Sequence, residues 1–216
     1  CIRDRDLTTE NLDALRKGIV NLERHVENIR KFGLQPVVAL NSFYSDTEAE
    51  REFMRTWAKD FGVALAEADV WAKGGEGAKE LAETLLENLS EGQAHQLYDP
   101  AEGVEKSIEK IATEVYRATS IEYGPKAKKD LQYIKDNGWD NFPVVISKTQ
   151  YSFSDSPASL GAPEGHTLHV RELLPRTGAG FIVVLTGDVM TMPGLPKKPA
   201  ANNIDVAADG TISGPV

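Results

Sequence analysis

The stretch Asn41-Ser-Phe-Tyr-Ser-Asp-Thr-Glu-Ala-Glu50 decides the fold, because it directly follows a short apolar run at 36–40. A second stretch, Trp71-Ala-Lys-Gly-Gly-Glu-Gly77, comes after a similar run at 63–66. Both runs have the length and the composition of buried strands. In open parallel α/β sheets, ligands bind in the crevice beyond the carboxyl ends of the strands. We therefore expect Phe43 and Trp71 to hang over one such crevice.

A helical pattern precedes the first of these strands. Residues 8–32 carry leucine, isoleucine and valine at alternating spacings of three and four, which predicts a helix with one core-facing stripe. Thr8 or Thr9 is the expected N-cap, and Gly33 is the expected stop.

Two further helices are expected after the strands. Ser45 and Glu48 have the spacing of a capping box, and Asp46 between them is interpreted as a helix cap. The first of these helices is expected to bury Phe53, Trp57 and Phe61, and the second is expected to carry Leu81, Leu85 and Leu89 on one face. Alternating helices and strands imply parallel strands joined by right-handed crossovers. The first part of the chain is therefore predicted to be an α/β unit, part of a doubly wound parallel sheet.

The pattern changes beyond a polar segment at 90–100, which predicts a boundary between domains at 1–100 and 101–216. The expected elements of the second domain are helices at about 102–118 and 125–135 and strands at 143–146, 167–170 and 181–185. Helices followed by a separate group of strands are typical of a smaller α+β domain.

Composition restricts the classes of function. The 216 residues have a formal net charge of −9 and no lysine- or arginine-rich run, which argues against nucleic acid and anionic membranes as partners. The single cysteine, Cys1, leaves no disulfide within the chain, so a reducing, cytoplasmic setting is the default expectation. Because the sequence starts with Cys rather than Met, we expect a fragment or a processed chain.

Phe43 and Trp71 allow two interpretations. Aromatic faces hold a flat heterocycle by offset stacking, and both residues follow a strand rather than lie within it. Large aromatics also dominate protein cores, so burial at the strand ends is the alternative. Asn41, at the edge of the first strand, could read a heterocycle through the donor and acceptor of its side-chain amide.

The glycine-rich loop also allows two interpretations. Lys73, Gly74, Gly75 and Gly77 precede a helix, where backbone N–H groups and a lysine can approach an anion. The alternative is a tight turn without a ligand, which the sequence favours because no Walker A pattern occurs anywhere in the chain. Zinc-type histidine spacing and a Gly-x-Ser-x-Gly elbow are absent too, and His166 and His169 should point to opposite faces of one strand.

At these residues the sequence resembles the formate–tetrahydrofolate ligase family, from about Thr9 to the last residue. The segments that carry the resemblance are Asn21-Leu-Glu-Arg-His-Val-Glu-Asn-Ile-Arg-Lys-Phe-Gly33, Val37-Val-Ala-Leu-Asn41-x-Phe43-x-x-Asp46, Trp71-Ala-Lys-Gly-Gly-Glu-Gly77, Lys148-Thr-Gln-Tyr-Ser152, Arg171-Glu-Leu-x-Pro175, Gly178-Ala-Gly-Phe181 and Thr191-Met-Pro-Gly-Leu-Pro196.

This resemblance implies a P-loop NTPase-like fold, an ATP-dependent ligation of formate to tetrahydrofolate through formyl phosphate, and a homo-oligomer. Phe43 and Trp71 match the aromatics that hold the pterin. Family members are longer and carry a phosphate-binding loop that this chain lacks, so ATP and Mg²⁺ are expected to bind mainly outside it. The resemblance leaves a monovalent cation open as an activator.

Three hypotheses follow for the chain itself. It is part of an active ligase, an inactive pterin-binding fragment, or a non-catalytic interaction module on the same scaffold. The catalytic residues remain unknown from this sequence, since the groups expected to activate formate belong to the missing part.

Overall fold

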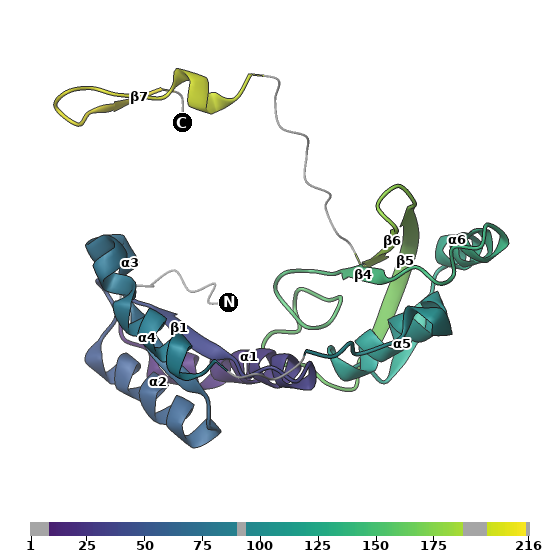
Figure 1. The fold of residues 1–216 in the computed structure, drawn as a ribbon, viewed down its shortest axis with the longest axis horizontal. Helices are drawn as coiled ribbons and strands as arrows, with labels where there is room; N and C mark the ends of the chain where they lie inside the picture. Colours follow the sequence, from purple (N-terminus) through teal and green to yellow (C-terminus); the bar gives the residue numbers. More distant parts are fainter. Residues whose placement is uncertain (1–8, 90–93, 188–197, 215–216) are drawn as a thin grey trace.

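The computed structural model describes residues 9–89, 94–187 and 198–214 (Figure 1). The first half contains α1 (Leu12–Lys31), β1 (Val37–Asn41), α2 (Glu48–Phe61), β2 (Ala64–Ala68), α3 (Val70–Lys73), the 3-10 turn η1 (Gly74–Ala78) and α4 (Lys79–Glu87). The second half contains η2 (Pro100–Glu102), α5 (Val104–Glu114), β3 (Ser120–Tyr123), α6 (Pro125–Asp136), β4 (Val144–Ser147), β5 (Thr167–Arg176) and β6 (Phe181–Thr186). A short segment at 198–214 adds η3 (Ala200–Asn203), β7 (Asp205–Val206) and β8 (Ile212–Ser213).

β1 and β2 pair in parallel, as the alternating pattern predicted. Their register runs from Val37 opposite Ala64 to Asn41 opposite Ala68, so both strands end at the same edge. Two strands are too few to establish a doubly wound sheet of the P-loop NTPase type, and that finer assignment stays a prediction. The observed architecture is mixed α/β with parallel strand pairs.

α1 and α2 build the core of the first half. The stripe of α1 packs with Met54, Trp57 and Ala58 of α2 around the buried Val26. The Trp57 indole N–H donates to Glu23 Oε1 at 2.9 Å, so its polar end is satisfied as well. The expected burial is confirmed for Trp57, whereas Phe53 and Phe61 are partly buried and pack against the same core.

The N-cap of α1 differs from the expectation. Asn11 caps the helix, because its side-chain oxygen accepts from Ala14 N at 2.9 Å. Thr9 lies two residues too early, and Thr8 falls outside the described residues. Gly33 follows the helix with φ +78°, a left-handed conformation that suits the predicted stop.

The capping box of α2 is also displaced from the predicted one. Thr47 Oγ1 accepts from Glu50 N at 3.3 Å, and Glu50 Oε2 accepts from Thr47 N at 3.1 Å. The predicted box at Ser45 and Glu48 was therefore wrong by two residues. Both pairs have the same Ser/Thr-x-x-Glu spacing, so the sequence offered two registers and the structure uses the second.

The leucines expected on one face of the helix after the glycine loop differ in their exposure. Leu81 is half-buried, but Leu85 and Leu89 are 50% and 67% exposed, and Leu86 beside them is 68% exposed. Periodicity identified an apolar face, but no described element covers that face beyond the first turn of the helix.

The second half contains a four-stranded mixed sheet in the order β3-β5-β6-β4. β3 pairs in parallel with β5, β4 pairs in parallel with β6, and β5 and β6 are antiparallel. β3 was not predicted from the sequence. Because it lies between α5 and α6, the helices and strands of this half are not segregated along the chain as had been expected. α5 and α6 pack on the sheet through Ile108, Leu131 and Ile134.

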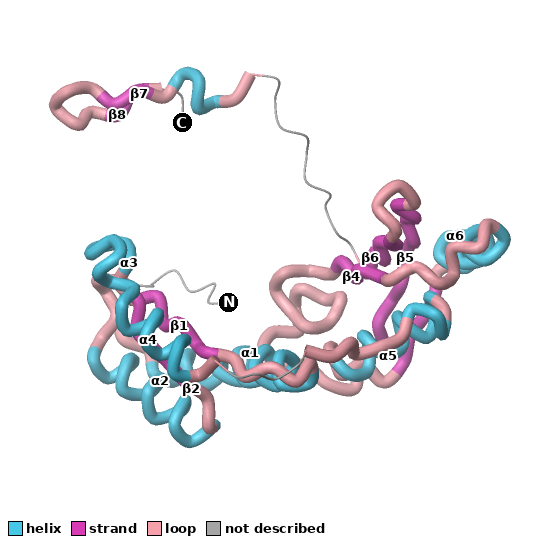
Figure 2. The backbone as a smooth tube through the Cα atoms, viewed as in Figure 1, coloured by secondary structure: helices cyan, strands magenta, loops and turns pink. Residues whose placement is uncertain are grey.

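α1 connects the two halves, and Figures 1 and 2 both show it running between the β1–β2 unit and the larger sheet. Arg24, only 6% exposed, donates to Glu164 Oε1 at 2.6 Å. Nearby, Lys31 Nζ donates to the Glu114 carbonyl at 2.6 Å. α1 thus packs on both halves, and the domain division at residue 100 stays a prediction.

Within the described ranges, no helix combines the length and the apolar character needed to cross a bilayer. The sequence segment Thr191–Pro196, which contributed to the family resemblance, lies outside those ranges.

Candidate functional site

A pocket of about 350 Å³ opens beyond the carboxyl ends of β1 and β2. The Ser42 backbone N–H donates to Ala68 O at 2.9 Å, which extends the pairing by one residue and brings the two following loops together. The lining residues are Ser42, Phe43, Tyr44, Arg51, Glu67, Asp69, Trp71, Ala72, Lys73, Glu76, Gly77 and Glu80. The pocket lies where the strand-edge argument placed a ligand site.

Phe43 and Trp71 both line this pocket and are both open to solvent. Phe43 is 60% exposed and Trp71 is 87% exposed. Across the described residues, neither ring stacks on another aromatic ring. The alternative that both are core aromatics is therefore wrong, because their exposure leaves ring surface free for a ligand.

Backbone contacts fix the loops that carry these rings. Asp46 Oδ2 accepts from Phe43 N at 2.8 Å, and Asp46 N donates to Phe43 O at 3.1 Å. Asp46 was predicted to cap α2, but it instead closes the loop that presents Phe43. On the other side, Asp69 N donates to Gly77 O at 3.0 Å, which closes a loop around α3 and Trp71.

The structure gives a reason for two glycines of this loop, packing at Gly77 and backbone conformation at Gly74. A Cβ at Gly77 would lie 2.2 Å from the Asp69 carbonyl oxygen, so any larger residue would displace this close approach. Gly74 has φ +57°, whereas Gly75 has open space around it. These contacts account for a tight turn, and anion binding at Lys73 to Gly77 stays a prediction.

Charge in the pocket is mostly negative. Four carboxylates line it, from Glu67, Asp69, Glu76 and Glu80, against the two cations Arg51 and Lys73. Lys73 Nζ already lies 3.1 Å from Asp69 Oδ2. Such a lining suits a neutral ring with N–H groups better than a triphosphate, because clefts of one charge sign repel ligands of the same sign.

Glu67 is held in place by Arg55, which reaches it from α2. Arg55 pairs with Glu48 at 2.7 Å, with Glu52 at 3.0 Å and with Glu67 at 2.5 Å. Hydrogen bonds that Arg55 donates to Glu48, then to Glu67 and Glu52, raise the pKa of its guanidinium above the ordinary value. Glu67 Oε1 is therefore engaged below the pocket, and its carboxylate is oriented before any ligand arrives.

Comparison with known proteins decides the family. The family model described as formate–tetrahydrofolate ligase matches residues 2–216. The chain belongs to the formate–tetrahydrofolate ligase family.

Relatives that carry this family name are closely similar over almost the whole chain. A formate–tetrahydrofolate ligase of Corynebacterium jeikeium (strain K411) is 58% identical over 97% of this chain and 39% of its own length. One of Corynebacterium diphtheriae (strain ATCC 700971 / NCTC 13129 / Biotype gravis) is 60% identical over 97% of this chain and 38% of its own length. One of Staphylococcus carnosus (strain TM300) is 53% identical, again over 97% and 38%. The chain therefore spans about two fifths of the length of these relatives.

Asn41, which was predicted to contact the ligand, does not line the pocket that contains Phe43 and Trp71. It ends β1 opposite Ala68, is exposed, and is not among the residues that line the cavity. Sequence reasoning instead missed Ser42, Arg51 and Glu67. Ser42 follows β1 directly, but Arg51 comes from the first half of α2, and no pattern in the sequence shows that this helix face borders the crevice.

The motif at Lys148–Ser152 has a bracing role in the structure. Lys148 is half-buried, and its ammonium donates to the carbonyls of Thr149 and Ser152. It also lies 5.6 Å from the ring centroids of Tyr116 and Phe153. Burial lowers the pKa of Lys148. These contacts fasten the loop after β4, far along the chain from the pocket residues.

The histidines do not assemble a metal centre within the described ranges, where no group of three metal-ligating side chains converges. His169 Nδ1 lies 2.7 Å from Asp155 Oδ2. Both ring nitrogens of His166 are buried without a hydrogen-bond partner in the described chain, and burial lowers the pKa of this imidazole.

Proposed function

We propose that this chain is the folate-binding part of an enzyme that ligates formate to tetrahydrofolate. The overall reaction consumes ATP, passes through formyl phosphate, and gives 10-formyltetrahydrofolate, ADP and phosphate. The observation that carries the proposal is the pair of exposed rings, Phe43 and Trp71, over one pocket at the edge of the parallel strands.

Stacking is the physical basis of this assignment. A pterin is flat and uncharged, and an aromatic face adds about 1 kcal/mol to its binding beyond the area buried. The rings are held by short loops closed at both ends, so little conformational freedom is lost when a ligand stacks on them.

The role of the chain in the reaction is to bind and orient the acceptor. In the proposed second step, the lone pair of N10 of tetrahydrofolate attacks the formyl carbon, phosphate leaves as the C–O bond breaks, and the N10 proton passes to the departing phosphate or to water. Orientation of the reacting atoms lowers the barrier of such a transfer, because the entropy of their alignment is lost on binding instead. Phe43 and Trp71 would fix the pterin end of the folate and thereby the position of N10.

The described residues do not fit ATP with Mg²⁺. The pocket has four carboxylates, and the described ranges hold neither a Walker A loop nor a group of three side chains suited to a metal ion. We therefore propose that ATP, Mg²⁺ and formate bind in the remaining length of the family's proteins, where phosphoryl transfer would take place. A homo-oligomer, a cytoplasmic location and an activating monovalent cation belong to the same proposal for the longer protein.

Removal of the aromatic rings tests the pterin site. Trp71→Ala and Phe43→Ala should each weaken pterin binding roughly fivefold, the equivalent of about 1 kcal/mol per ring. Equilibrium dialysis against pterin measures this without relying on the tryptophan signal. Tyr133→Ala, which removes an exposed aromatic from α6, is the matched control and should leave the affinity unchanged.

The same experiment separates the interaction module from the two hypotheses in which the chain binds pterin. Unchanged pterin affinity in both pocket variants would refute the aromatic site. Pterin binding by the wild-type chain is expected both of a part of an active ligase and of an inactive pterin-binding fragment. An absence of pterin binding by the wild-type chain would favour a non-catalytic interaction module.

A further inference from the structure

Arg51 is a cation of the pocket lining that has no direct ion-pair partner among the described residues. It lies on α2, one turn before Arg55, and is half-buried. Its Nε is inaccessible to solvent and has no hydrogen-bond partner. Among the residues that the structure describes, Arg51 makes no side-chain ion pair, although four carboxylates line the same pocket.

The neighbouring carboxylates are engaged elsewhere. Glu67 pairs with Arg55, Asp69 with Lys73 at 3.1 Å, and Glu76 with Lys79 at 2.6 Å. Glu80 Oε1 accepts from Glu67 N at 3.4 Å. These pairings turn the acidic side chains toward other partners and leave the Arg51 guanidinium without a carboxylate partner among the described residues.

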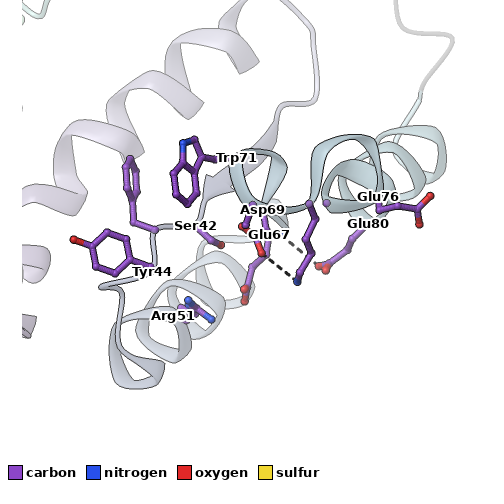
Figure 3. A pocket seen from close by; sticks show the side chains of 12 residues that line it. Ser42, Tyr44, Arg51, Glu67, Asp69, Trp71, Glu76 and Glu80 are labelled. Atoms are coloured by element: carbon purple, nitrogen blue, oxygen red, sulfur yellow. Dashed lines mark hydrogen bonds and ion pairs between the residues drawn. The ribbon is translucent and has the colours of Figure 1, made fainter. Parts of the chain in front are cut away.

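A second polar group of the same pocket is also unsatisfied. Ser42 Oγ is buried without a hydrogen-bond partner in the described chain. Buried polar groups without partners are rare in native structures, and a ligand is one of the explanations for them. In the close-up of Figure 3, Trp71 stands at one side of the pocket and Arg51 at the other, with Ser42 in the same opening.

The chemistry of the guanidinium indicates what it would bind. Arg carries only donors, in a fixed planar arrangement, and therefore needs an acceptor on the ligand. A ring stacked on Trp71 would direct its edge, rather than its face, toward the pocket floor. A ring carbonyl at that edge would accept a hydrogen bond from Arg51. An exocyclic amine there would instead place its own N–H groups against those of the guanidinium.

We propose that Arg51 is a specificity-determining residue that hydrogen-bonds the 4-oxo group of a pterin held at Phe43 and Trp71. This inference rests on the proposed function and deepens it, because it names which edge of the ring the site reads. Arg51 would also lower the affinity of the site for adenine, which carries an amine in place of a ring carbonyl.

A pair of ligands tests the inference directly. Pterin carries the 4-oxo group, and 2,4-diaminopteridine carries an amine at that position. A hydrogen bond to a charged group is worth on the order of tenfold in affinity, and a donor left facing a donor adds to the difference. The wild-type chain should therefore prefer pterin by at least about tenfold at neutral pH.

The decisive variant is Arg51→Met, which keeps the length of the side chain and removes its donors. We expect the preference for pterin to fall roughly tenfold, mainly through weaker binding of pterin, with a smaller gain for the diamine as the facing donor is removed. Arg51→Lys should retain part of the preference, since one charged donor remains. Arg16→Met on the exposed face of α1 is the control for loss of an arginine, and circular dichroism verifies the fold of each variant.

The outcomes distinguish this inference from the proposed function. Binding that requires Trp71 but keeps the same ligand preference in Arg51→Met would overturn the role of Arg51 alone. Equal losses for both ligands in Arg51→Met would also overturn it, because they would indicate a general packing role. Failure of the wild-type chain to bind either ligand would remove the proposed function itself.

Discussion

At the scale of single residues, the pocket depends on loop positions where no larger side chain fits. Gly77 approaches the Asp69 carbonyl so closely that a methyl group would overlap it, and this contact closes the loop that carries Trp71. The sequence suggested an anion loop or a tight turn, and the contact gives the turn a physical cause. The glycine pattern was visible in the sequence, but the approach of residue 69 was not, because it depends on the path of α3.

Gly77→Ala should destabilise the chain by about 1–3 kcal/mol, because the new methyl group forces the backbone apart. Thermal unfolding followed by circular dichroism measures the loss, and pterin affinity should fall with it as Trp71 moves. Gly75→Ala is the matched control, since a Cβ there meets nothing within 4 Å. Equal stability of the two variants would contradict the packing argument.

At the scale of elements, periodicity located most helices and strands, and local chemistry set their ends. The parallel pair β1–β2 and the core stripes of α1 and α2 were predictable, because burial imposes regular spacing. β3 was missed because it is only four residues long and lies between two helices. The polar part of the pocket was missed because Arg51 comes from a helix packed beside the crevice, which depends on tertiary structure.

The capping box of α2 offers a test at this scale. Thr47→Ala removes the side chain that accepts from Glu50 N and should lower the free energy of unfolding by about 1 kcal/mol. Ser45→Ala changes the rival box and should have little effect. Chemical denaturation of both variants compares them, and a larger loss for Ser45→Ala would show that the helix starts at the earlier residue.

At the scale of the whole molecule, the first half has an apolar surface without a described cover. Leu85 and Leu86 of α4 and Leu89, two residues beyond its end, are at least half exposed, and among the described strands β1 and β2 pair only with each other. Relatives are about two and a half times as long as this chain, since it spans 39% of one of them. Sequence periodicity predicted the apolar face, but periodicity does not specify what packs against a face.

This exposed face predicts how the isolated 216-residue chain behaves in solution. Contiguous apolar surface and unpaired strand edges both promote association, so light scattering should show a mass that rises with protein concentration. Replacement of Leu85, Leu86 and Leu89 by glutamine should reduce that rise while leaving pterin binding intact, since none of the three lines the pocket. Leu160→Gln, at a single exposed leucine of the second half, serves as the control and should not change the association. A wild-type chain that stays monomeric at all concentrations would contradict the argument, because the leucine face would then be stable in water on its own.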